Sequence, residues 1–201
     1  LGLVGSEMCI RDRSKEPEKK QFDLFSEKMI GTRTIVLSGE INEQVAKDVC
    51  SQLLLLESIN DEPINLFISS NGGHVDSGYL IFDMINFIKP KVNIIGSGWV
   101  VSAGALIYLS SEKERRYCLP NTRFMIHEPS GGTQGQSSDM QITANEILRT
   151  REKINQLIAK ETGKDIEEVR KDTARDFWLT AEEALDYGLV NKIIKERNEI
   201  E

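Results

Sequence analysis

The stretch from Val92 to Ser111, VNIIGSGWVVSAGALIYLSS, constrains the fold more than any other part of the chain, because it contains no charged residue. A run of this length is long enough to span a membrane as a helix. Glycines and serines interrupt it repeatedly, however, and no further apolar segment adjoins it. We therefore expect a buried strand over Val92–Ile95, a glycine-rich turn, and a helix that begins near Ser102.

Ser102 has two interpretations from this stretch alone. Serine is a favoured N-cap residue, so the side chain could simply cap the helix. The first turn of a helix also carries unpaired N–H groups and the positive end of the helix dipole. An acyl-transfer enzyme needs a nucleophile and oxyanion donors in such a place, so Ser102 is equally a candidate nucleophile.

Composition narrows the function classes. The net charge of −7, without an extended basic block, argues against a nucleic-acid partner. The three cysteines are far apart and lack the spacing of a metal site, so we expect free thiols in a reducing compartment. No secretory signal is recognisable at the start of the sequence, and together these features favour the cytoplasm.

The length of 201 residues predicts one main domain. Residues 1–20 combine a short apolar start with a highly charged segment, so we expect a disordered or non-native extension. The domain itself is predicted over residues 21–195, followed by a tail at residues 196–201.

Hydrophobic periodicity predicts strands that alternate with helices, which is typical of an α/β domain with parallel strands. A capping box is predicted at Thr180, a helix C-cap at Gly163, and a loop over residues 129–136. Turns are expected at residues 40–42 and 70–73. Strands are expected at residues 34–38, 64–69, 92–95, 117–119, 124–127 and 190–194, and helices at 43–58, 77–89, 138–162 and 165–173.

Only two histidines are available as a general base. His127 ends an apolar strand and faces a loop, where an imidazole can serve as a base, although a locally bonded structural histidine fits the pattern as well. His74 follows paired glycines and is the rival. Asp172 and Asp176 are candidate acids or plain helix-cap and surface charges, and Asp176, before two aromatic residues, is expected to be tucked against apolar surface. The G-x-S-x-G nucleophile elbow is not satisfied, since Val100 occupies the first glycine position.

Four segments of this sequence resemble the ClpP family, the proteolytic subunits of an ATP-dependent compartmental protease, over about residues 21–195. They are SSNGGHVDSG (69–78), GSGWVVSAGA (96–105), RYCLPNTRFMIHEPSGGTQGQSSD (116–139) and KDTARDFWLTAEEALDYGLVNKII (171–194). The resemblance implies a crotonase-like α/β fold, with parallel β-sheet layers, flanking helices and a protruding handle helix.

The resemblance also implies roles for individual residues. Ser102 matches the nucleophile, His127 the general base, and Asp176 the acid that orients it. Gly73 and Ala103 match the oxyanion-hole positions. The segment that lines the substrate channel contributes the expected peptide-binding residues, which are Gly131, Gly132, Thr133 and Gln134. No metal and no cofactor is implied.

At the level of assembly, the resemblance implies two stacked heptameric rings, homo- or hetero-oligomeric, that enclose the active sites. An AAA+ ATPase unfoldase would feed unfolded polypeptides into this chamber, where they would be cut into short peptides. Neither nucleic acid nor a membrane is an implied partner.

Departures from the family pattern indicate a divergent paralogue rather than the housekeeping form. Trp99 and Val100 are bulkier than usual, so they would narrow the substrate pocket or repack the core. Ala174 and Gln141 stand where carboxylates are common, beside an arginine that normally pairs across the ring–ring contact. The stretch before residue 21 lacks the usual axial loop. A mainly structural or regulatory ring subunit that depends on a partner paralogue is therefore the alternative, and acyl-CoA chemistry on the related crotonase scaffold is a third.

Overall fold

The computed structural model describes residues 27–132 and 134–200, and the fold discussed here is that of the unit that begins at Arg33. Across these described residues, no helix combines the length and the apolar character that crossing a membrane requires. The Val92–Ser111 stretch forms a strand and then a helix of 6 residues, so the membrane-span alternative is wrong. The predicted extension at residues 1–20 lies outside the described residues, and the predicted domain limits stay predictions.

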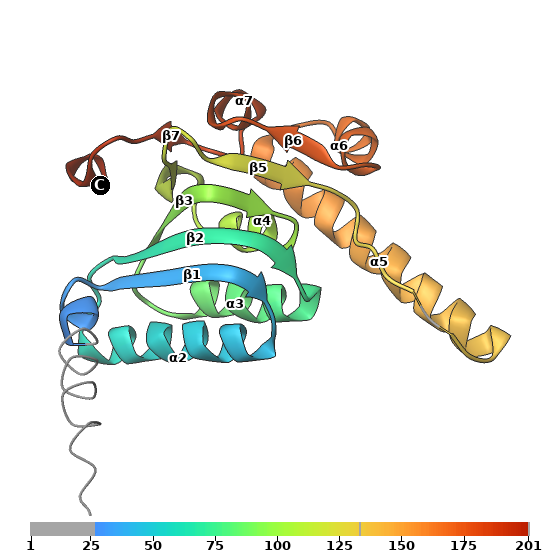
Figure 1. Ribbon diagram of the computed structural model, residues 1–201, viewed down its shortest axis with the longest axis horizontal. Helices are drawn as coiled ribbons and strands as arrows, with labels where there is room; N and C mark the ends of the chain where they lie inside the picture. Colours follow the sequence, from blue (N-terminus) through green and yellow to red (C-terminus); the bar gives the residue numbers. More distant parts are fainter. Residues whose placement is uncertain (1–26, 133, 201) are drawn as a thin grey trace, which may run out of the picture. The chain divides into compact units, whose positions relative to one another are not determined.

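A mostly parallel sheet forms the centre of the unit (Figure 1). Its main path runs β1-β2-β3-β4-β7, and β5 and β6 join it beside β3. Every pairing is parallel except that of β5 with β6. The strands are β1 (Thr34–Ile41), β2 (Ile64–Gly73), β3 (Val92–Val101), β4 (Arg116–Cys118), β5 (Arg123–Ile126), β6 (Phe177–Leu179) and β7 (Lys192–Ile193).

Helices cover the sheet and extend beyond it (Figure 1). The helix α3 (Val75–Phe87) packs against both α2 (Glu43–Ile59) and α4 (Ala103–Tyr108). In turn, α2 contacts β1, and α4 contacts β2 and β3. The long helix α5 (Ser137–Thr162) runs outward, and its buried residues, Asn155 and Ile158, lie in its C-terminal half. The helices α6 (Ile166–Thr173) and α7 (Ala181–Tyr187) follow it. The predicted α/β fold with a protruding helix is thus confirmed.

The main core lies between the sheet and the helices. Alternate residues of β2 are buried, as expected for a strand with one face on the core. The other face of the sheet carries a smaller apolar cluster around Ile95, Tyr117 and Ile194. Fully buried members of the main core include Ile35, Leu37, Leu53, Leu66, Ile68 and Ile81.

Local signals mark several helix ends, although α3 spans Val75–Phe87 where residues 77–89 were predicted. Asn42 caps α2 by accepting a hydrogen bond from the Val45 N–H at 2.9 Å. The capping box of Thr180 and Glu183 at the start of α7 is present as predicted. Gly163 ends α5 in the left-handed conformation, with φ of 75°.

The strands β1, β2 and β3 were predicted too short. Residues 70–73 and 96–101, expected as turns, continue β2 and β3, because Gly73 pairs with Ile41 and Val100 pairs with Ser70. Likewise residues 40–41, expected in a turn, extend β1 beyond a bulge. The last strand is shorter than the predicted 190–194, and the three-residue strand β6 was not predicted.

A buried ion pair fixes the end of α5 to the sheet. The Arg116 side chain on β4 is fully buried and pairs with Glu161 in the last turn of α5. Its Nε also donates a hydrogen bond of 2.8 Å to the carbonyl of Ser111. Because a buried arginine requires such partners, this contact anchors α5 where it passes the candidate site.

Candidate active site

Strand register brings the three candidate catalytic residues together. β5 pairs in parallel with β3, from Trp99 opposite Arg123 to Val101 opposite Met125, so Ser102 comes just after this pairing. β5 also pairs antiparallel with β6, where Ile126 faces Phe177. Continuing that register by one residue places His127 opposite Asp176. The pairing of β5 with β3 and with β6 therefore brings together side chains from three parts of the chain that are distant in sequence.

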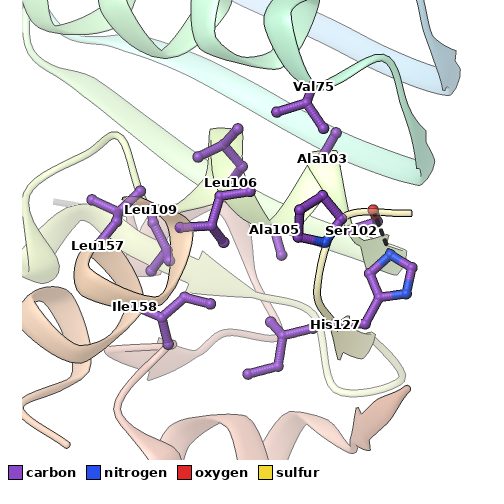
Figure 2. A pocket seen from close by; sticks show the side chains of 12 residues that line it. Val75, Ser102, Ala103, Ala105, Leu106, Leu109, His127, Leu157 and Ile158 are labelled. Carbon is purple, nitrogen blue, oxygen red and sulfur yellow. Dashed lines mark hydrogen bonds between the residues drawn. The ribbon is translucent and has the colours of Figure 1, made fainter. Parts of the chain in front are cut away.

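The three side chains form a chain of hydrogen bonds. His127 Nε2 lies 2.8 Å from Ser102 Oγ (Figure 2), and His127 Nδ1 lies 2.9 Å from Asp176 Oδ1. An ionised carboxylate only accepts hydrogen bonds, so Nδ1 is the donor toward Asp176. In the neutral imidazole Nε2 is then the acceptor, which lets it take the hydroxyl proton of Ser102. The arrangement is that of a nucleophile, a base and an orienting acid.

Ser102 is held in a strained backbone conformation. Its φ of 54° and ψ of −118° lie outside the regions that L-residues favour. Its N–H donates a hydrogen bond of 2.9 Å to the carbonyl of Met125, which holds the turn against β5. Ser102 occupies the N-cap position of α4, but its side chain makes no capping hydrogen bond, so the interpretation as a mere helix cap is wrong.

Gly72 lies directly against the serine. A Cβ built on Gly72 would be 2.7 Å from Ser102 Cβ and 3.3 Å from Ser102 Oγ. The φ of Gly72 is also 92°, in the region that favours glycine. The sequence showed only a pair of glycines here, and nothing in it indicated which of them approaches the serine.

The predicted oxyanion donors come from two elements, β2 and α4. Ala103 is the first residue of α4, and the first intrahelical bond is from the Leu106 N–H to the Ser102 carbonyl, so the N–H of Ala103 precedes the helical ladder. Gly73 packs on β1, since a Cβ there would be 2.2 Å from the Ile41 carbonyl oxygen. Their role as oxyanion donors stays a prediction.

An apolar pocket opens beside Ser102 (Figure 2). It has about 440 Å³ of space free of atoms, part of it open to solvent, of which only about 30 Å³ admits the centre of a water-sized sphere. Trp99 and Val100 do not line it: Val100 is fully buried in the core, and the Trp99 side chain is 48% exposed. Val100 therefore fits the alternative in which a bulky residue repacks the core, whereas the exposed Trp99 neither lines this pocket nor joins the core. The lining residues are Val75, Ser102, Ala103, Ala105, Leu106, Leu109, Ile126, His127, Pro129, Ile154, Leu157 and Ile158.

His127 also lines a second, wider and more polar groove. It encloses about 1090 Å³, part of it open to solvent, and it is lined in part by Gly131, a predicted substrate-binding residue. Gly132 and Gln134 belong to the same loop but line neither cavity, and Thr133 lies outside the described residues. The groove-lining residues are His127, Glu128, Pro129, Ser130, Gly131, Ile147, Ala174, Arg175 and Asp176.

One expectation about the acid was wrong. The Asp176 side chain is 61% exposed, so the neighbouring aromatic residues do not shelter it. The competing candidates lie elsewhere. Asp172 accepts a hydrogen bond of 2.9 Å from the Tyr187 hydroxyl, and His74 Nδ1 lies 2.9 Å from Ser77 Oγ instead of approaching Ser102.

The two buried thiols take no part in this site. Burial raises the pKa of the Cys118 thiol to about 12, with a smaller contribution from the charge of Glu182. Burial also raises the pKa of Cys50. In the part of the chain that the structure describes, no group of three or more His, Cys, Asp or Glu side chains could hold a metal ion.

The known proteins that are similar to this chain are members of one protease family. The family model "Clp protease" matches residues 16–197. ATP-dependent Clp protease proteolytic subunit 3 of Rhizobium etli is 48% identical over 194 residues, which cover 95% of this chain and 100% of that protein. Proteolytic subunit 2 of Pseudomonas aeruginosa is 55% identical over 168 residues, or 84% of each chain.

Among solved structures, ClpP1 from Listeria monocytogenes superimposes with a TM-score of 0.81 at 54% identity. The match covers 88% of this chain and 99% of the other. With a family model that spans most of the sequence and relatives about half identical over most of its length, this chain belongs to the Clp protease family.

Proposed function

We propose that this chain is a serine endopeptidase subunit whose nucleophile is Ser102. The hydrogen-bonded chain from Ser102 through His127 to Asp176, with links of 2.8 and 2.9 Å, carries this proposal. Peptidases of this type need these three groups in this order, and names of the similar proteins, which include "proteolytic subunit", support the same activity.

The reaction follows from the roles of the groups. Ser102 Oγ attacks the carbonyl carbon of the peptide bond while His127 Nε2 takes the hydroxyl proton. Asp176 stabilises the imidazolium, which then gives its proton to the leaving amine as the acyl-enzyme forms. Water repeats the cycle, with His127 again as the base, and releases the new carboxylate. Donors near Ala103 would stabilise the oxyanion in both steps.

The cavities suggest how an unfolded polypeptide would bind. The apolar lining of the pocket beside Ser102 favours an apolar over a charged side chain next to the cleaved bond. An extended peptide laid along the loop at residues 129–136 would gain backbone hydrogen bonds with little dependence on sequence. Both features favour polypeptide substrates over a single small molecule.

We place the subunit in a two-ring assembly served by a separate AAA+ unfoldase. The outer half of α5 exposes Met140, Ile142 and Leu148, a helix surface suited to contact with other subunits. The term "ATP-dependent" in the names of the similar proteins supports a separate source of ATP hydrolysis. A cytoplasmic location is part of the same proposal.

Hydrolysis of short fluorogenic peptides by the purified chain tests the activity. We expect Ser102→Ala to lower kcat/KM by at least about 10³-fold while circular dichroism and oligomeric state stay the same. Equal hydrolysis by wild type and Ser102→Ala would remove Ser102 from the mechanism.

A second candidate function is a mainly structural ring subunit that needs a partner paralogue. Arg175 favours it, because this side chain has no ion pair within the described part of the chain and its neighbour is Ala174. Native mass spectrometry of the chain alone, and mixed with a second family member, separates the two functions. Stable and active assemblies of this chain alone would exclude dependence on a partner.

A further inference from the structure

Glu128, the residue after His127, is attached to two other elements. Its N–H donates a hydrogen bond of 2.7 Å to the carbonyl of Thr173, the last residue of α6. Its carboxylate accepts a hydrogen bond of 3.1 Å from Arg151 Nη1 on α5. The first contact fixes the backbone of the residue that follows His127, and the second pairs the Glu128 carboxylate with a charge from α5.

The backbone contact has its own buried support. Thr173 is only 1% exposed, and its hydroxyl lies 2.9 Å from Asn155 Oδ1, a side chain of α5 that is 2% exposed. The loop that carries His127 is therefore fixed without the Glu128–Arg151 ion pair. Changes of charge at Glu128 or Arg151 can be made while this anchor stays intact.

The charges around His127 come from a small number of elements. Three charged side chains line the groove together with His127, namely Glu128, Arg175 and Asp176. Asp176 is already hydrogen bonded to the imidazole. α5 adds Arg151, which pairs with Glu128.

The remaining neighbours also carry charged groups. On α6, Arg170 pairs with Glu152 and Glu167, and Asp172 accepts a hydrogen bond from the Tyr187 hydroxyl. α4 contains no charged residue, so it adds none to the pocket. On α5, Lys153 lies over the ring of Tyr79 at 3.7 Å. Beside Val75, which lines the pocket, the titratable groups are His74 and Asp76, which lie 3.8 Å from each other.

We propose that the Glu128–Arg151 ion pair balances the charge along the groove that His127 lines, so that both residues act as positioning residues for the base of the reaction. This inference rests on the proposed function, since it concerns the base of the same reaction. It links α5, far from the serine in sequence, to the pH range in which the peptidase works.

The sign of each change follows from Coulomb's law. Arg151→Gln leaves the Glu128 carboxylate unpaired in the groove that His127 lines, which favours the imidazolium. The acid limb, the part of the pH profile in which kcat/KM rises with pH, then moves to higher pH. Glu128→Gln leaves Arg151 unpaired, which disfavours the imidazolium and moves the same limb to lower pH. At partly exposed positions each shift should be about 0.3 to 0.8 pH unit.

The experiment measures kcat/KM for a short fluorogenic peptide between pH 5 and 9. We expect shifts of opposite sign for the two single variants, and a limb near that of the wild type for both the double variant and Arg151→Lys. Arg149→Gln is the matched control, because Arg149 lies on the same helix and pairs at 2.5 Å with Glu146, away from the groove. Its limb should not move.

Limbs that coincide with that of the wild type, or that move in the same direction in both single variants, overturn the inference. If Arg151→Gln does not assemble, the direction in which the acid limb moves in Glu128→Gln tests the inference by itself. A wild-type chain with no peptidase activity overturns the proposed function and the inference together. An active wild type with unmoved limbs overturns the inference only.

Discussion

Gly72 offers a direct test of how closely the site is packed. In Gly72→Ala the new Cβ would lie 2.7 Å from Ser102 Cβ and 3.0 Å from the Val101 carbonyl oxygen. Carbon atoms in contact prefer about 3.5–4.0 Å, so one of the two segments must move by about 1 Å. A misplacement of that size at a nucleophile can cost about 10²-fold in rate. The positive φ of Gly72 adds a backbone cost of about 1–2 kcal/mol to the folding free energy.

Gly39 separates these two effects. Its φ of 87° is close to the 92° of Gly72, but a Cβ at Gly39 would meet no atom within 4 Å. Gly39→Ala should therefore lower the unfolding midpoint without lowering kcat, and Gly72→Ala should lower both. Peptidase kinetics and urea unfolding of the two variants measure this. If Gly72→Ala kept kcat within about threefold of the wild type, the described contact with Ser102 would be refuted.

Three further predictions concern stability and reactivity. Glu161→Ala leaves the buried Arg116 without its carboxylate and should reduce the unfolding free energy by about 3–5 kcal/mol, measured by urea denaturation. With its pKa at about 12, the Cys118 thiol should resist iodoacetamide at pH 8 until a denaturant is added, and rapid alkylation of the native protein would contradict its burial. The pKa of Glu183 is lowered mainly because its carboxylate accepts a hydrogen bond from the Thr180 backbone, and to a smaller extent by a hydrogen bond with the Thr180 side chain. The stabilisation of the fold by the Glu183 carboxylate is therefore present above the ordinary glutamate pKa and is lost as the pH falls through the lowered pKa. The difference in Tm between wild type and Glu183→Ala should be present at pH 6 and vanish toward pH 3.

The helices could be predicted because their signals are local. Asn42, Thr180 and Gly163 each act on the backbone within a few residues, so sequence alone places the ends that they mark. The extent of β3 could not be predicted in this way. Gly96 looks like a turn residue, but a Cβ there would lie 3.2 Å from Phe124 Cζ, so the glycine reflects close packing against a strand distant in sequence.

The site was predicted in part. Ser102, His127 and Asp176 were recognisable from family-like segments, and the structure places His127 within hydrogen-bonding distance of both Ser102 and Asp176. The exposure of Asp176 could not be predicted, because the following aromatic pair does not determine which way the preceding carboxylate faces. The contact of Gly72 with Ser102 depends on strands that meet only in three dimensions, so no local pattern reveals it.

The central claim is that Ser102 is a nucleophile activated by His127. Mass spectrometry of the chain after reaction with a fluorophosphonate probe tests it most directly. We expect a single adduct on the peptide that contains Ser102, lost in Ser102→Ala and slowed at least about 10²-fold in His127→Ala. An unlabelled wild-type chain, or a Ser102→Ala chain that is labelled as fast as the wild type, would contradict the claim.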